Sequence, residues 1–104
     1  MSFDVEDVLS KMADAINNEV VDSVGDIKDY AKKVMKKEED SLRELALARV
    51  TGEIDDEILE MEIEREKKVV EAELLTMQIM TKALAQRVVN AALNVFYTAV
   101  KAAI

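Results

Sequence analysis

One group of acidic side chains in this chain has the spacing of a metal site. The group lies near one face of a predicted helix and consists of Glu57, Glu60, Glu64 and Glu71. Helical bundles that bind paired iron ions use such glutamates together with a Glu-x-x-His motif. The chain contains no His, and Glu64 can pair with Lys68 one helical turn later. We therefore predict a solvated charged face and no metal or other cofactor. A carboxylate-only cage for Mg²⁺ or Ca²⁺ is the alternative.

Groups that could carry out covalent or acid–base catalysis are scarce. The chain has no His and no Cys, and it lacks a glycine-rich phosphate loop. The hydroxyl groups of Ser10, Ser23 and Ser41 lie on predicted helices or at their caps, where no base accompanies them. We therefore predict that the protein is not an enzyme.

Two asparagines lie in the apolar segment Ala83–Ile104. Asn90 and Asn94 are one helical turn apart in a segment whose only charged residues are Arg87 and Lys101. Polar residues in an apolar helix can fix the register or the oligomeric state by hydrogen bonding across an interface. Asn90 and Asn94 are candidates for this role, and simple exposure to solvent is the alternative.

Most of these residues belong to one long stretch, Ile54–Ile104, which must position them. It contains no Gly and no Pro, so we predict one helix of about fifty residues, roughly 75 Å long. Its first part, Asp55–Glu73, is dense in charge, whereas Leu74–Ile104 is mostly apolar. A compact domain of this length has a radius of gyration of about 13 Å. Such a helix therefore requires a break, a rod-like hairpin or several chains.

Two shorter helices precede the long one in a single helical domain of residues 1–104. We expect helices at about residues 4–24, 26–50 and 55–103. Gly25 ends or kinks the first helix, and Gly52 ends the second, because glycine adopts a positive φ without a Cβ clash. Asp55 then caps the long helix, so that Gly52 lies at a tight corner between antiparallel helices. A further break at Ser41 is the alternative to a continuous second helix.

The pattern predicts an all-α fold, a three-helix chain or helical hairpin that assembles into an oligomeric helical bundle. The long C-terminal helix carries two adjacent heptad-like apolar lines, and one amphipathic helix folded against it cannot cover both. Apolar surface left in water costs about 25 cal/mol per Å², which favours a homo-oligomer, either a dimer or larger. The predicted interface residues are Leu74, Met77, Leu84, Val88, Ala91, Val95, Phe96 and Val100.

The charge and the apolar pattern of the sequence argue against two classes of function. With 22 acidic against 14 basic residues the net charge is −8, which argues against nucleic-acid binding. Polar residues interrupt the apolar C-terminal segment, which argues against a membrane span. We predict a cytoplasmic, non-enzymatic, self-assembling scaffold or adaptor. The alternatives are a chaperone or antitoxin-like protein that covers a protein client, and a membrane-active amphipathic helix.

Overall fold

The structure, a computed structural model, describes residues 4–20, 25–76 and 81–104. Five α-helices make up most of these residues. The helices are α1 (Val5–Glu19), α2 (Gly25–Lys37), α3 (Glu39–Val50), α4 (Asp56–Leu75) and α5 (Lys82–Ala102). These residues contain no β-strand, so the prediction of an all-α fold is confirmed.

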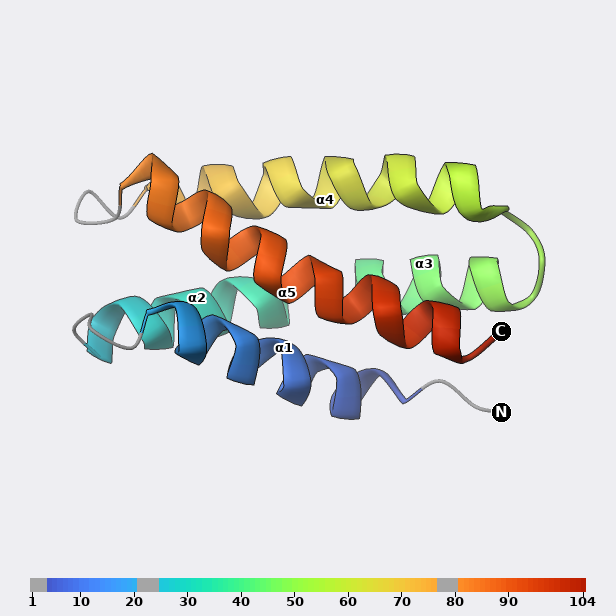
Figure 1. Ribbon diagram of the computed structural model, residues 1–104, viewed down its shortest axis with the longest axis horizontal. Coiled ribbons are helices and arrows are strands. Elements are labelled where there is room, and N and C mark those ends of the chain that lie inside the picture. The colour runs from blue at the N-terminus through green and yellow to red at the C-terminus, as the bar shows by residue number, and fades with distance from the viewer. Residues whose placement is uncertain (1–3, 21–24, 77–80) are drawn as a thin grey trace.

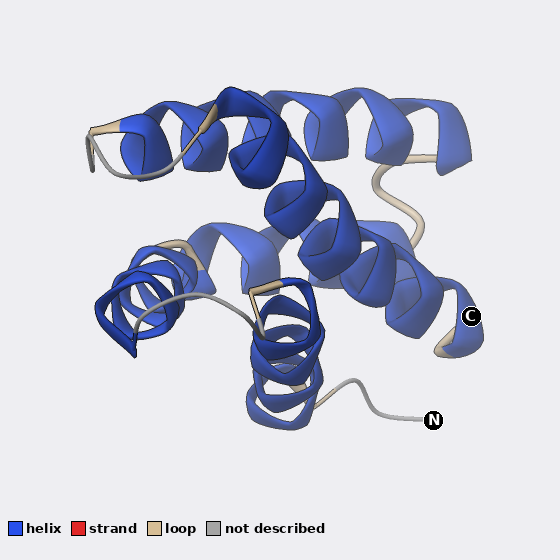
Figure 2. Ribbon diagram, turned by 60° about the vertical axis from the view of Figure 1, so that its left-hand side comes forward, coloured by secondary structure: helices blue, strands red, loops and turns tan. Residues whose placement is uncertain are grey.

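Helix α5 lies at the centre of the fold. Figure 1 shows α5 between α4 on one side and α1 on the other, and its most extensive contacts are with these two helices. Helices α2 and α3 each contact both α1 and α4, and α3 also contacts α5. The rotated view in Figure 2 shows the same order, with α5 crossing between α4 and α1. The apolar C-terminal segment is therefore enclosed by the other helices of the same chain.

The predicted long C-terminal helix is wrong, because Ile54–Ile104 forms two helices, α4 and α5, that run in opposite directions. Helix α4 ends at Leu75 and α5 begins at Lys82, and residues 77–80 lie outside the described residues. The longest dimension of the molecule is 40 Å, and its radius of gyration is 13.4 Å. A helix of about 75 Å has no place in a molecule of that size. Folding back lets α4 cover part of the apolar surface of α5 within one chain.

Side-chain hydrogen bonds stabilise both ends of this break. At the end of α4, the carbonyl oxygen of Glu73 accepts from Thr76 Oγ1 (2.6 Å) and from Tyr30 Oη of α2 (3.1 Å). At the start of α5, the side chain of Thr81 accepts a hydrogen bond from the backbone N–H of Leu84 (3.1 Å). Two threonines and a tyrosine from another helix thus satisfy backbone groups at helix ends that carry no Gly or Pro.

The boundaries of the first two predicted helices also differ from the observed ones. Helix α1 ends at Glu19, and residues 21–24 lie outside the described residues. Gly25 is the first residue of α2, so it begins a helix and does not kink one. The continuous second helix is wrong, because Glu38 separates α2 from α3. The alternative break at Ser41 is wrong as well, since Ser41 lies inside α3. The turn falls in the stretch Lys36–Ser41, which has no apolar side chain to pack on the core.

The predicted corner at Gly52 is confirmed. Gly52 has a φ of +85°, and the N–H of Glu53 donates to the carbonyl oxygen of Ala48 (2.8 Å), which closes the end of α3. Asp55 caps α4 as predicted, because its side chain accepts from the N–H of Ile58 (2.9 Å). This corner reverses the chain, so that α4 returns along α3.

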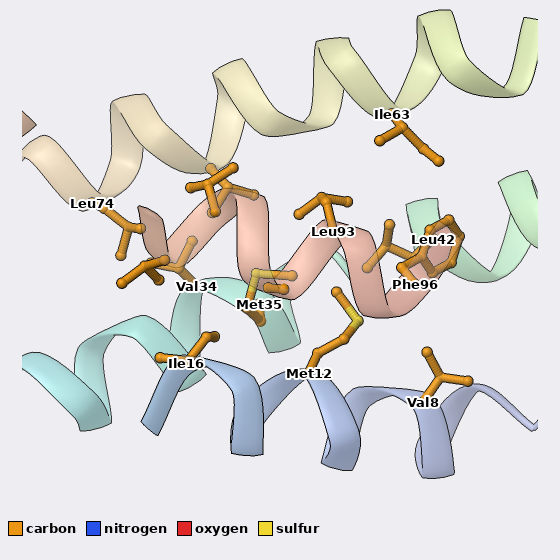
Figure 3. Close-up of a cluster of buried hydrophobic side chains, with 14 of the residues drawn as sticks. Val8, Met12, Ile16, Val34, Met35, Leu42, Ile63, Leu74, Leu93 and Phe96 are labelled. Atoms are coloured by element: carbon orange, nitrogen blue, oxygen red, sulfur yellow. The ribbon is translucent and has the colours of Figure 1, made fainter. Parts of the chain in front are cut away.

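The five helices share one hydrophobic core, part of which Figure 3 shows. Its buried members include Val8, Met12, Ile16, Val34, Met35, Leu42, Ala46, Leu59, Ile63, Val70, Leu74, Val88, Leu93, Phe96 and Val100. The chain exposes 6179 Å², close to the roughly 5,800 Å² expected for a folded monomer of its mass. One copy therefore covers most of the apolar surface of α5 without help from a second.

Asp56 connects the ends of three helices. Its Oδ1 accepts from Arg49 Nε of α3 (2.8 Å), and its Oδ2 accepts from Lys101 Nζ of α5 (2.6 Å). The hydrogen bond from Arg49, and after it the one from Lys101, holds the pKa of the Asp56 carboxyl below its ordinary value. The hydrogen bond with Asp56 in turn raises the pKa of Lys101. Lys101 Nζ also lies 5.9 Å from the centre of the Tyr97 ring. These contacts hold the end of α5 against the start of α4.

We expect Val88→Asp to lower the free energy of unfolding by at least about 3 kcal/mol. Val88 is fully buried, and an unpaired carboxylate at that position would lose its hydration. Asn94→Asp adds the same charge at an exposed position of α5, so it should change the free energy of unfolding by less than about 0.5 kcal/mol. Urea titration followed by far-ultraviolet circular dichroism measures both values. A Val88→Asp chain as stable as the Asn94→Asp chain would contradict the placement of Val88 in the core.

Candidate functional site

Helix α4 carries apolar side chains on two opposite faces. Its inner face, formed by Leu59, Ile63, Val70 and Leu74, is buried in the core. Its outer face carries four large apolar side chains that remain exposed, and we name these the outer stripe: Ile58 (41% exposed), Met61 (54%), Val69 (45%) and Leu75 (36%). Among the described residues, only Leu47 and Ile104 are comparable exposed hydrophobic side chains outside α4. Exposed apolar side chains grouped on one helix make this face a candidate interaction surface.

The central part of the outer stripe is symmetric about Arg65. Met61 lies four residues before Arg65 and Val69 four residues after it, while Ile58 and Ala72 lie seven residues away on either side. With about 3.6 residues per turn, these positions fall on one side of the helix. Met61 and Val69 therefore exchange places when the direction of the helix is reversed about Arg65, whereas Leu75 has no apolar counterpart, because Asp55 occupies the mirrored position.

The charged residues of α4 pair with one another along the helix. Arg65, at the centre of the stripe, places its Nη1 3.1 Å from Glu62 Oε1, so its charge has a counter-ion in the same chain. Glu64 pairs with Lys67 (3.2 Å) and not with Lys68 as predicted. Within the described part of the chain, no three acidic side chains are arranged to hold a metal ion. These exposed pairs add little stability, but they keep the helix face soluble.

The residues predicted to form an oligomer interface lie mainly inside the single chain. Leu74, Val88, Phe96 and Val100 are fully buried, and Leu84, Ala91 and Val95 are partly buried. Met77 lies outside the described residues. Because α1 and α4 cover the apolar surface of α5, its buried side chains are not accessible to a second copy in this fold. A surface contact between copies therefore has to use other residues.

Asn90 and Asn94 lie on the exposed side of α5. Asn94 lines a shallow depression beside Tyr97 of the same helix and Glu60 and Lys67 of α4. Neither amide is buried in an apolar interface within the chain, so neither sets the packing of α5 there. Their role in fixing the register between copies remains a prediction.

A groove of about 360 Å³ lies between α3 and α4. Leu45, Ala48, Ile54 and Ile58 line its apolar part, and its acidic lining residues are Glu44, Glu62 and Glu66. We name this feature the acidic groove. It combines apolar surface with carboxylates from both helices, so it differs in character from the outer stripe.

Glu66 is an unusual carboxyl in the acidic groove. The pKa of Glu66 is raised to about 7. Partial burial is the largest cause, and a hydrogen bond with the Glu38 carboxyl and the negative charges of Glu38 and Glu62 add to it. No basic side chain or backbone N–H of the described residues donates to Glu66 Oε2, although this atom is shielded from solvent. Once it is ionised, above a pH of about 7, Glu66 therefore carries a negative charge that the surrounding residues compensate poorly.

None of the predicted site residues belongs to the outer stripe or to the acidic groove. The sequence does carry a signal for the outer stripe, because Met61 and Val69 flank Arg65 at helical spacing inside the charged segment. The apolar residues of the inner face are interleaved with it and obscure that signal. The acidic groove has no comparable signal, since Glu38 and Glu66 are far apart in the sequence and come together only when α3 packs on α4.

The outer stripe and the acidic groove are the features from which a function can be inferred. Comparison of the chain with models of protein families, with curated proteins and with solved structures finds no significant match. Within residues 4–20, 25–76 and 81–104, no helix combines the length and the apolar character that crossing a bilayer requires.

The raised pKa of Glu66 predicts a pH dependence of stability. In the folded chain Glu66 keeps its proton up to a pH of about 7, whereas in the unfolded chain it loses it near the ordinary value of 4.5. The contribution of protonated Glu66 to the free energy of unfolding is therefore fully present below pH 4.5 and is lost as the pH rises through 7. We expect Glu66→Gln to raise the free energy of unfolding by about 1 kcal/mol at pH 8, a value reduced by solvent screening of this half-exposed group.

At pH 4 the same substitution should leave the free energy of unfolding nearly unchanged, because Glu66 is then neutral in both states. Urea titrations of the parent and the variant at the two pH values measure the difference. Glu60→Gln, at an exposed position of α4, serves as the control. An equal effect of Glu66→Gln at pH 4 and pH 8 would show that the carboxyl is not destabilised by its surroundings.

Proposed function

We propose that the protein is a non-enzymatic, self-assembling scaffold or adaptor, in which the outer stripe of α4 forms the contact between copies. The observation that carries this proposal is the exposure of Ile58, Met61, Val69 and Leu75 on one face of a helix whose other face is buried in the core. Exposed apolar surface of this kind is stabilised when a second apolar surface covers it. The contact is thus assigned to α4, whereas the sequence pattern alone favours the C-terminal helix.

The symmetric placement of Met61 and Val69 about Arg65 favours a second copy as the partner. In a two-fold dimer the same patch on both copies must complement itself. When two α4 helices pack antiparallel about Arg65, Met61 of each copy lies opposite Val69 of the other. Each Arg65 near the axis brings Glu62 as its own counter-ion, which limits the repulsion between the two guanidinium groups.

The expected contact is small. From Ile58 to Leu75 the stripe extends roughly 26 Å along the helix, and it contains only four large apolar side chains. Interfaces of this size are usually weak and transient, so we expect a dimer with a dissociation constant in the micromolar range or above. A weak, reversible dimer suits an adaptor that joins other components, because its assembly depends on local concentration.

We expect the double variant Met61→Glu/Val69→Glu to remain monomeric at concentrations at which the parent chain dimerises. The two added carboxylates would face each other across the antiparallel contact, and both positions are exposed, so the fold is retained. Sedimentation equilibrium over a range of protein concentrations measures the association, and circular dichroism checks helicity. Leu47→Glu is the control, because Leu47 is 60% exposed but lies on α3, outside the stripe.

Cysteine pairing tests the antiparallel arrangement, and the absence of native Cys makes it unambiguous. Under mild oxidation, a mixture of Met61→Cys and Val69→Cys chains should form more mixed disulfide than either chain forms with itself. Arg65→Cys, near the axis, should form a disulfide with its own copy. A parent chain that stays monomeric at about 1 mM would refute the proposed self-assembly. Equal loss of association in Leu47→Glu would refute the assignment to the outer stripe.

A further inference from the structure

The acidic groove is as long as about two turns of a helix. Its α3 side extends from Ser41 to Ala48 and its α4 side from Ile58 to Glu66. Each side therefore covers about two helical turns, or roughly 12 Å. Leu45 and Ile54 are partly buried and Ile58 is exposed, so the groove presents apolar surface to whatever enters it.

The carboxylates along this groove are short of counter-ions. Among the described residues, Glu44 and Glu66 form no ion pair, and Glu62 is paired with Arg65. Glu66 Oε2 is shielded from water and still receives no hydrogen bond from a basic or backbone donor. A cationic group placed beside Glu66 would supply the missing charge compensation and would favour the ionised form of the carboxyl.

We infer that the acidic groove binds a basic amphipathic helical segment of a partner protein. Apolar side chains one turn apart on that segment would pack against Leu45 and Ile58, while flanking Lys or Arg side chains would pair with Glu44 and Glu66. This combination of an apolar contact surface with complementary charge is a general way in which proteins bind helices. Contact over only two turns implies weak binding that falls as the salt concentration rises.

A second copy of this chain fits the groove less well than such a segment. The basic helix of the chain is α2, whose exposed lysines are Lys32, Lys33, Lys36 and Lys37. Its apolar side chains Val34 and Met35 are buried in the core and cannot reach the groove of another copy. Met61 and Val69 do not line the groove, so partner binding and self-assembly can be tested with separate variants.

The probe for this experiment is a fluorescein-labelled peptide, LKKLLKLLKKLLKL, which forms an amphipathic basic helix. We expect Glu44→Gln/Glu66→Gln to weaken its binding, measured by fluorescence anisotropy at pH 8, by at least about tenfold relative to Glu57→Gln/Glu60→Gln. Both double variants change the net charge from −8 to −6, so general attraction to an acidic protein affects them equally. A second peptide with Ser in place of every Leu, and the same charge, should bind the parent more weakly because it cannot fill the apolar part of the groove.

Nuclear magnetic resonance locates the binding site independently. On addition of the Leu/Lys peptide, the amide shifts of Leu45, Ala48, Ile54 and Ile58 should change most. Equal weakening in the two double variants would show attraction by net charge alone and would overturn the inference. Shift changes confined to Met61, Val69 and Leu75, the stripe residues that do not line the groove, would overturn it as well. Concentration-dependent changes in the groove and α2 without peptide would instead identify a second copy as the occupant. In the double variant Met61→Glu/Val69→Glu the peptide should still bind, whether or not the chain self-assembles.

Discussion

The apolar surface of α5 is the feature on which the rest of the structure depends. The helix buries Ala85, Val88, Val89, Ala92, Leu93, Phe96 and Val100, and these side chains occupy one broad arc of its surface. A single neighbouring helix cannot cover such a surface. The chain meets this constraint by placing α1 and α4 against different sides of α5 and by joining them through α2 and α3. The opposite directions of α4 and α5 follow from the same requirement, because a continuous helix could not place α4 against α5 in one chain.

Local signals in the sequence predict some boundaries well and others poorly, for physical reasons. Gly52 and Asp55 act through their own backbone and side chain, so the corner that they form can be predicted from neighbouring residues alone. The end of α4 depends partly on Tyr30, which lies on another helix and reaches Glu73 only after folding. With no Gly or Pro near Thr76, the pattern predicts a continuous helix. That one boundary changes the expected assembly, since a continuous helix leaves apolar surface for other copies to cover.

The fold also determines which residues remain for function. Most of the predicted interface residues contribute to the core, and the exposed apolar surface is found instead on α4, within the segment that charge dominates. Helix α4 thus contacts the core on one side and presents the outer stripe on the other, while its edge facing α3 forms the acidic groove. The positions of both surfaces depend on the packing of α4 against α5 in the same molecule. If α5 were covered by another copy, α4 would be placed differently and both surfaces would change.

The central claim, that α5 is covered by its own chain, can be tested most directly by isotope-filtered nuclear magnetic resonance on an equimolar mixture of ¹³C-labelled and unlabelled protein. Figure 3 shows Met12 of α1 directed toward α5, where Leu93 and Phe96 lie in the same core. We expect nuclear Overhauser effects between the Met12 methyl group and these side chains to appear in the spectrum of contacts within labelled chains. They should be absent from the filtered spectrum that selects contacts between labelled and unlabelled chains. The same effects in the filtered spectrum would show that another copy covers α5, and would contradict the account.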